Sequence, residues 1–151
     1  MPYSIGDVAN MLNIPTSTLR YYDREGLLSN MKRSRGGIRV FSDMEIGTLR
    51  MIECLKSTGM QIKDIKQFLD WCQKGDLTLQ QRRDMFYERR AVVEKQMEEL
   101  QKTLEMIQFK CWYYETACEA GTEDALRNIS VNDVPEVARR GKAALERSLL
   151  E

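Results

Sequence analysis

Histidine is absent from the 151-residue sequence. Its absence removes the most frequent general base of enzymes and the most frequent nitrogen ligand of zinc. The sequence also lacks a glycine-rich phosphate loop and a carboxylate pair placed in an evident cleft. We therefore expect that the chain is not an enzyme and that it carries neither a cofactor nor a resident metal site.

Long apolar runs are also missing, since none approaches the ~18 residues that a membrane-spanning helix needs. Residues 1–4 lack the basic and apolar regions of a signal peptide. We therefore expect a cytoplasmic protein with no membrane partner. In that reducing compartment the four scarce and unevenly spaced cysteines should be free thiols. They are Cys54, Cys72, Cys111 and Cys118.

The formal net charge of zero conceals an uneven distribution along the chain. Residues 15–41 hold two acidic side chains, Asp23 and Glu25, against a larger basic group. The basic residues of this segment are Arg20, Arg24, Lys32, Arg33, Arg35 and Arg39. From residue 76 onward acidic side chains outnumber basic ones. A basic front and a mildly acidic rear are typical of a protein that offers one end to a polyanion.

The basic segment begins with two short helices. Ser4 and Asp7 resemble a capping box for a first helix over 4–12, and Pro15 opens a second over 16–25, which Gly26 ends. Two short helices with a brief joint indicate a helix-turn-helix, whose second helix enters the DNA major groove. An ordinary amphipathic surface helix would have a similar composition. The basic hairpin that follows argues against that alternative.

Residues 29–41 form this predicted hairpin, with its turn at 34–37. Its cations would repel one another in isolation, whereas beside a phosphate backbone they displace counterions and strengthen binding. We therefore expect a wing. Two further helices, over 42–58 and over 61–74, should complete the domain. The apolar stripe of the first consists of Ile46, Leu49, Ile52 and Leu55. We expect Cys72 on the buried side of the second.

A long helix follows, for which Thr78 and Gln81 are the expected cap. Its apolar positions alternate in steps of four and three residues, the heptad pattern of a coiled coil, and a second copy of the chain is the economical partner. They are Val93, Met97, Leu100, Leu104, Ile107, Cys111, Tyr114 and Cys118. The expected fold is mainly α: a winged helix-turn-helix DNA-binding domain at 1–75, a dimerisation helix at 76–120 and a short helical C-terminal segment at 121–151.

Several stretches together resemble the MerR family of bacterial transcription regulators over residues 3 to about 118. The most specific are residues 18–23 (TLRYYD), 26–28 (GLL) and 37–41 (GIRVF). Phe41 stands where the family usually has tyrosine. The resemblance implies a homodimer with an antiparallel coiled coil that distorts double-stranded promoter DNA and so acts on RNA polymerase indirectly, through the promoter.

By position, the resemblance also implies which residues contact DNA. Helix contacts would come from Thr16, Ser17, Arg20 and Tyr21. Wing contacts would come from Lys32, Arg33, Arg35 and Arg39.

Three classes of effector are possible: a reactive electrophile, an organic ligand bound between the C-terminal segment and the coiled coil, and a metal. Metal-responsive relatives use a thiol or hydroxyl where this chain has Leu79. Cys111 and Cys118 lie about 10.5 Å apart along one helix, too far for one zinc. Cys54 stands away from the apolar stripe of its helix, near Arg50 and Lys56. It matches the single cysteine of the family's aldehyde- and electrophile-responsive branch, so we expect it to sense the effector.

A purely structural coiled-coil protein is the alternative from another class. It would explain the heptads but not the basic wing. Binding to duplex DNA that weakens steeply with salt separates the two hypotheses.

Overall fold

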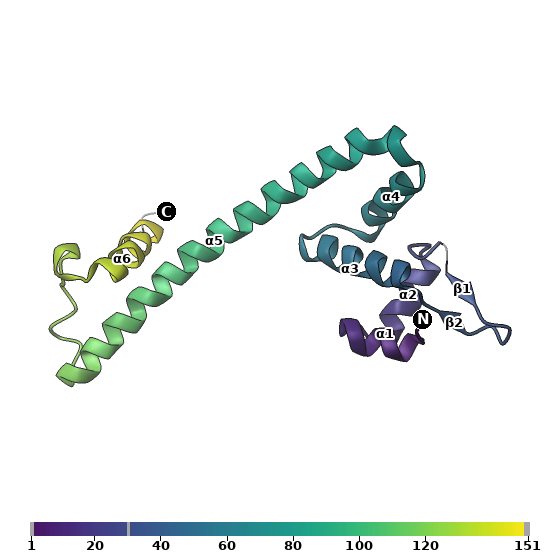
Figure 1. Ribbon diagram of the computed structural model, residues 1–151. Helices are drawn as coiled ribbons and strands as arrows, with labels where there is room; N and C mark the ends of the chain where they lie inside the picture. The colour runs from purple at the N-terminus through teal and green to yellow at the C-terminus, as the bar shows by residue number, and fades with distance from the viewer. Residues whose placement is uncertain (1, 30, 150–151) are drawn as a thin grey trace. The chain divides into compact units, whose positions relative to one another are not determined.

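The structure is a computed structural model that describes residues 2–29 and 31–149. Its elements follow one another as helices α1 to α6, with the short hairpin β1–β2 after α2 (Figure 1). Contacts group the chain into two compact units, Met1–Arg90 and Ala91–Glu151. Each unit is described by itself below. The mainly helical fold and the N-terminal helix-turn-helix with a wing confirm the predicted fold class.

The helix-turn-helix consists of α1 (Ile5–Leu12) and α2 (Thr16–Arg24). Ser4 and Asp7 form the predicted capping box of α1, and their hydrogen bonds lower the pKa of Asp7. Asn13 ends α1 in the left-handed conformation, at a φ of 53°, which asparagine tolerates better than most residues. The joint between the helices is therefore short, and its geometry is set by local sequence.

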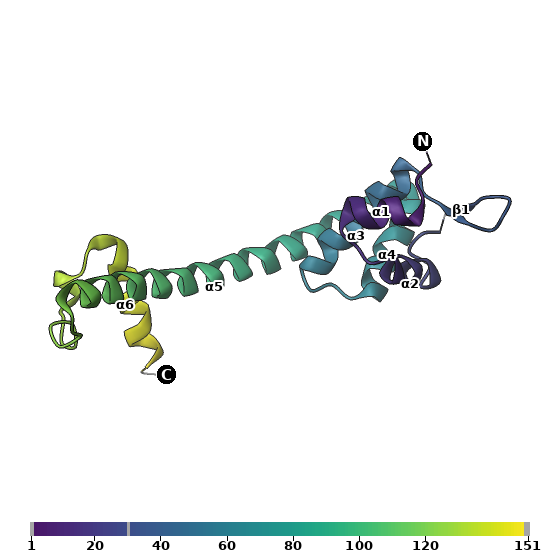
Figure 2. The same ribbon diagram turned by 90° about the horizontal axis from the view of Figure 1, so that it is seen from below.

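The wing is an antiparallel pair of two-residue strands, β1 (Lys32–Arg33) and β2 (Arg39–Val40). In both views the hairpin projects away from the helices of its unit (Figures 1 and 2). Its turn lies at residues 34–37 as predicted: Gly37 has a φ of 76°, and its amide donates to the Ser34 carbonyl. Beyond β2, Phe41 is fully buried and pairs through its backbone with Tyr3.

Helix α3 (Asp43–Ser57) supplies the centre of the first unit's core. All four residues of its predicted apolar stripe are buried. Ser42 and Glu45 form the capping box at its start. Burial raises the pKa of Glu45, but the hydrogen bonds from Ser42 outweigh that effect and, with the nearby Lys32 charge, lower it overall.

Helix α4 (Ile62–Gln73) and the 3-10 turn η1 (Gly75–Thr78) lead into α5 (Leu79–Ala120), a single helix of 42 residues. Two predictions are wrong here. The side chain of an N-cap residue accepts a hydrogen bond from a backbone amide of its helix. The Thr78 hydroxyl instead donates to the carbonyls of Trp71 and Gly75 and so connects the turn to α4. Cys72 is exposed on α4, because the buried face of that helix is centred on Ile65 and Phe68.

The second unit contains the rest of α5, the 3-10 turn η2 (Val131–Asp133) and α6 (Glu136–Ser148). Phe109, Val134 and Ala138 form its small buried cluster. Gly141 lies so close to α5 that a Cβ atom there would stand 1.9 Å from the Glu105 carbonyl oxygen. Helix α6 therefore packs against the Glu105–Phe109 face of α5.

Across residues 2–29 and 31–149, none of the helices combines the length and the apolar character needed to cross a membrane.

Candidate nucleic-acid interface

Helix α2 divides cleanly into a buried face and an exposed face. Leu19 and Tyr22 are fully buried in the core of the first unit. Ser17 and Arg20 are exposed, Tyr21 is 38% exposed and Thr16 is half-buried. Hydroxyl and guanidinium groups can donate hydrogen bonds to DNA bases and phosphates. On α2 these groups thus lie together on the exposed face. All four predicted helix contacts lie at or near this surface.

The wing is fastened to α2 by Asp23. The Arg39 Nε donates to the Asp23 Oδ2 at 2.7 Å, and the Arg33 Nη2 lies 3.3 Å from the same oxygen. Arg33 also donates to the Gly37 carbonyl at 3.2 Å, across the turn of the hairpin. The Arg39 and Asp23 side chains are only 22% and 19% exposed. The position of the wing relative to α2 is therefore held by charge-assisted hydrogen bonds.

This arrangement corrects the expectation that the wing cations only repel one another when no DNA is bound. Arg33 and Arg39 gain a shared carboxylate, while Lys32 and Arg35 stay exposed on the hairpin. The wing thus carries two kinds of cation. One kind orients the hairpin, and the other is accessible to a polyanion.

Behind the exposed face of α2, Tyr22 connects that helix to α3. Its hydroxyl donates to the Glu53 Oε1 at 2.6 Å and accepts from the Lys56 Nζ at 2.7 Å. The Lys56 ammonium also lies 5.2 Å from the centre of the Tyr22 ring. Burial, together with the neighbouring Glu53 carboxylate, raises the pKa of Tyr22 well above its ordinary value of 10.0, so the phenol remains a neutral donor at physiological pH.

Cys54 is exposed on α3, between Glu53 and Lys56 in sequence. The Lys56 ammonium, one of the two cations expected beside the thiol, is engaged with Tyr22 and Glu53. Cys111 and Cys118 are exposed as well. Residues 2–29 and 31–149 contain no group of three or more Cys, Asp or Glu side chains that could hold a metal ion.

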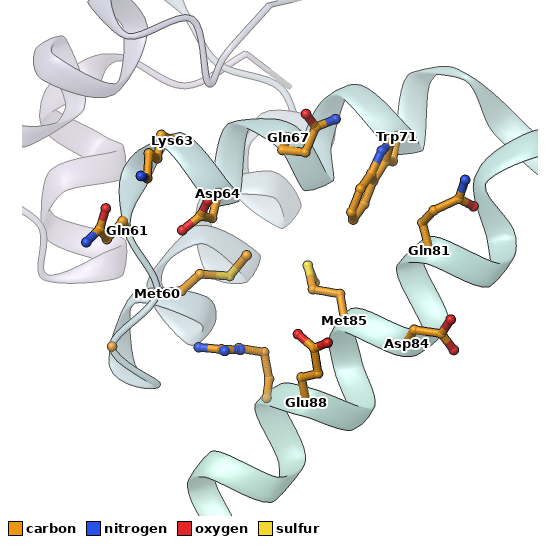
Figure 3. Close-up of a pocket in the computed structure, with 12 residues that line it drawn as sticks. Met60, Gln61, Lys63, Asp64, Gln67, Trp71, Gln81, Asp84, Met85 and Glu88 are labelled. Atoms are coloured by element: carbon orange, nitrogen blue, oxygen red, sulfur yellow. The ribbon is translucent and has the colours of Figure 1, made fainter.

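A hollow of about 620 Å³ lies elsewhere in the first unit, between α4 and the first turns of α5 (Figure 3). Met60 and Met85 point into it, and charged side chains such as Asp64 and Glu88 stand around it. None of the predicted DNA contacts and none of the cysteines lines this hollow.

Sequence reasoning missed two features of this region. The sequence prediction treated Asp23 only as one of two acids in a basic segment, although an acid among cations is the available signal for an ion pair. The Tyr22–Glu53–Lys56 cluster joins residues more than thirty positions apart, and no local pattern reveals such a contact.

Two family models match the chain. The one described as "MerR HTH family regulatory protein" matches residues 3–71, and the one described as "MerR, DNA binding" matches residues 46–108. An uncharacterized HTH-type transcriptional regulator of Haemophilus influenzae is 35% identical over 138 residues, which are 91% of this chain and all of that protein.

Two solved structures are similar to the chain. One is HiNmlR, a MerR family regulator lacking the sensor domain, bound to promoter DNA. It is 37% identical with a TM-score of 0.74, over 83% of this chain and 99% of that one. The other is a MerR family transcriptional regulator from Bacillus thuringiensis, 40% identical with a TM-score of 0.67, over 74% of this chain and 97% of that one. These relatives are transcription regulators, not enzymes. With its helix-turn-helix, its wing and a long helix that fits a coiled coil, the chain belongs to the MerR family of DNA-binding transcription regulators.

Proposed function

We propose that the chain acts as a homodimer that grips an inverted repeat in a promoter and changes the shape of the DNA in response to an effector. Residues 1–75 bind DNA, 76–120 dimerise and 121–151 form an accessory segment. Promoter DNA lies in the cytoplasm, so the protein acts there. The observation that carries the proposal is the exposed hydroxyl and guanidinium face of α2 beside a wing that Asp23 holds in place.

In this proposal α2 enters the major groove and the wing lies along the phosphates. The helix contacts are Thr16, Ser17, Arg20 and Tyr21, and the wing contacts are Lys32, Arg33, Arg35 and Arg39. The similarity to a regulator whose structure contains promoter DNA supports this docking. Bending and untwisting the promoter costs about 1–6 kcal/mol. RNA polymerase responds to the protein through the altered promoter.

The DNA contacts are tested by titrating promoter DNA at several salt concentrations. Arg20→Ala should lose about 1–3 kcal/mol of specific binding and relax sequence preference. Arg35→Ala should weaken binding to all sequences and lower the salt slope by about one, since one phosphate contact is lost. Lys63→Ala, which removes an exposed cation of α4, is the matched control. If the control weakens binding as much as Arg20→Ala does, the assigned face is wrong. No salt-dependent binding at all would favour a structural coiled-coil protein.

The effector in this proposal is an aldehyde or a related electrophile that modifies Cys54. The thiol adds across the carbonyl group: the C–S bond forms as the C=O π bond breaks, and the proton that the thiol gives up goes to the carbonyl oxygen, which yields a hemithioacetal. The exposure of Cys54 supports this step. So does its place on α3 between Glu53 and Lys56, the two residues that hold Tyr22 of the recognition helix. An adduct there would alter how α2 is held.

Promoter-dependent transcription with formaldehyde or methylglyoxal tests this part. Cys54→Ser should abolish the response while leaving DNA affinity unchanged. Cys72→Ser, which removes another exposed thiol of the same unit, should respond to the aldehyde as fully as the protein without substitutions does. A full response from Cys54→Ser would rule out sensing at Cys54 and favour an organic ligand.

A further inference from the structure

One hollow of the first unit has no part in the proposed function: the space of about 620 Å³ between α4 and the first turns of α5, here called the α4–α5 hollow. One face of each helix lines it, from Lys63 to Trp71 on α4 and from Gln81 to Arg89 on α5. Small-molecule sites in proteins have volumes of about 300–1,000 Å³. The hollow is therefore large enough to hold a small organic molecule.

The turn that joins the two helices holds their separation fixed. The Thr78 hydroxyl donates to a carbonyl of α4, and the Arg82 Nη2 donates to the Gly75 carbonyl at 2.7 Å. The rings of Phe68 and Phe86 also meet edge to face, with their centres 5.4 Å apart. A site whose walls are fixed before binding loses less conformational freedom when a ligand enters. The hollow is thus formed in advance of any ligand.

Apolar and polarisable groups lie in the interior of the hollow. Met85 is buried, and Met60 and Trp71 are half-buried. The thioether groups of Met60 and Met85 point toward each other across the hollow (Figure 3). Thioether and indole groups pack well against apolar molecules, and methionine adapts its shape to what it contacts. The interior therefore suits a ligand with an apolar body.

Arg89 brings an unsatisfied hydrogen-bond donor to this hollow. Its Nε is shielded from solvent, and no acceptor among residues 2–29 and 31–149 lies within hydrogen-bonding distance of that atom. A buried donor of this kind has lost water without gaining a partner, which is rare in folded proteins. A carboxylate is the acceptor that matches a guanidinium group best. The hollow is therefore suited to a ligand that carries a carboxylate.

The hollow also carries charges of both signs. Of its three carboxylates, that of Asp84 is paired with its sequence neighbour. Those of Asp64 and Glu88 have no ion pair or hydrogen bond within the described part of the chain, and the same holds for the cations of Lys63 and Arg89. A ligand of one sign would match one of these pairs and be repelled by the other. A ligand with one charge of each sign matches both.

We propose that the α4–α5 hollow binds a small zwitterion with an apolar body, of the kind that an apolar α-amino acid or a dipeptide forms. The carboxylate of the ligand accepts hydrogen bonds from Arg89, including its buried Nε. The ammonium group of the ligand donates to Asp64 and Glu88, and its apolar body lies between Met60 and Met85. This site goes beyond the proposed function, since it uses neither the DNA contacts nor a cysteine.

Binding can be measured through Trp71, which lines the hollow. The chain has two tryptophans, so Trp71 is the only reporter in full-length protein with Trp112→Phe. Titration with L-leucine and with L-leucyl-L-leucine should shift the emission of Trp71 until the signal saturates. The tighter of the two probes then shows whether the site takes an amino acid or a dipeptide. If neither probe gives a saturable shift at millimolar concentration, the proposal is wrong.

Blocking one charge of the tighter probe tests whether the site recognises a zwitterion. Amidation of its carboxyl group removes the negative charge, and acetylation of its amino group removes the positive charge. Each change should weaken binding by about tenfold or more, because a hydrogen bond to an ionised group is stronger than one to a neutral group. Unchanged binding after either modification overturns the proposal.

Arg89→Met tests the residue that carries the inference. The substitution keeps an unbranched side chain but removes the guanidinium group, so it should weaken binding of the tighter probe by about tenfold or more. Lys74→Met is the matched control, because it removes an exposed cation at the end of α4 that does not line the hollow. The control should bind the probe like the protein with Trp112→Phe alone. If both variants bind equally well, Arg89 does not hold the ligand and the assignment is wrong.

The ligand-free Arg89→Met protein distinguishes a ligand from a second copy of the chain as the source of the missing acceptor. If a ligand supplies it, the substitution removes an unsatisfied donor, so the melting temperature without ligand should stay the same or rise. Sedimentation should then show unchanged dimerisation. If the variant instead dissociates at concentrations where the protein without substitutions is a dimer, the acceptor lies in the second copy. That result refutes the zwitterion site and leaves the homodimer of the proposed function standing.

Discussion

The two units of the chain differ in how much of their apolar side chains they bury. In residues 2–29 and 31–90, a continuous core extends from Val8 to Met85 and buries Tyr22, Phe41 and Leu49 among others. In residues 91–149 the buried cluster contains Phe109, Val134 and Ala138, with a few partly buried neighbours. Large side chains along the same stretch of α5, such as Met97 and Leu100, remain 65% and 70% exposed.

This difference shows where each unit obtains its stability. The first unit buries enough apolar surface to be stabilised by its own packing. A solvated helix gains little from propensity alone and depends on packing of its apolar face, so the stability of the second unit should depend on association. Mass action then makes its stability vary with protein concentration, while that of the first should not.

The largest expected effect is the loss of core packing in the first unit. Leu49 is fully buried, so Leu49→Ala should cost about 2–5 kcal/mol, with the same loss at all protein concentrations. Leu100→Ala, the matched change at an apolar residue of α5 that is 70% exposed, should instead weaken the proposed dimer and lower the melting temperature most in dilute protein. Calorimetry over a wide concentration range measures both. If both variants melt independently of concentration, the contrast between the units is wrong.

Gly141→Ala should disturb the second unit alone. The added Cβ cannot fit beside the Glu105 carbonyl, so α6 must shift away from α5, at a cost of about 1–3 kcal/mol. Hydrogen exchange should accelerate in α6 and be unchanged in α1 to α3. Gly47→Ala is the control: that exposed glycine of α3 has open space around it, and alanine there should stabilise the helix by about 0.5–1 kcal/mol. Unchanged exchange in α6 of Gly141→Ala would contradict the close packing.

Tyr22→Phe should test the connection between α2 and α3. It keeps the buried ring and removes the hydroxyl that joins Glu53 to Lys56, at a cost of about 1–2 kcal/mol in urea unfolding. Tyr21→Phe, at the more exposed neighbouring ring, should change stability by less than about 0.5 kcal/mol. If the two substitutions change the free energy of unfolding equally, the hydrogen bonds of the Tyr22 hydroxyl to Glu53 and Lys56 do not stabilise the fold.

Asp23→Asn should have the smallest effect on stability, below about 1 kcal/mol, because its ion pairs are partly solvated. Its effect should be local: the amides of β1 and β2 should exchange faster, since the hairpin is no longer fastened to α2. Glu25→Gln removes an equal charge from a nearby exposed position and should leave wing exchange unchanged. If both variants speed exchange equally, loss of negative charge is the cause, and Asp23 is not a specific fastening.

Local sequence predicted the elements of the fold well because their signals are local. The capping residues Ser4 and Ser42 and the turn at Gly37 act within a few residues of their own positions. The predictions at Thr78 and Cys72 were wrong because tertiary contacts decide them: the hydroxyl bonds back to α4, and the core of the first unit reaches only part of that helix. The packing of Gly141 was not predictable, since a glycine inside a helix gives no sign of what approaches it.

For the candidate interface, residue type and order predicted the exposed cations, but not which of them Asp23 engages. That pairing depends on the path of the hairpin, which brings Arg39 back beside α2. The position of Tyr22 between Glu53 and Lys56 likewise depends on the packing of two helices. Sequence thus indicated the chemistry of the surface, and the folded chain defined how it is held.

The Asp23–Arg39 pair also constrains how such regulators can diverge. Loss of Asp23 removes the carboxylate that the partly buried Arg39 side chain shares with Arg33, so we expect substitutions at 23 to be accompanied by substitutions at 39 among relatives that keep a wing of this kind. Arg35, exposed at the turn, has no such linkage, so it can be replaced without disturbing the position of the wing. The geometry of the wing and its proposed affinity for phosphates therefore depend on different arginines.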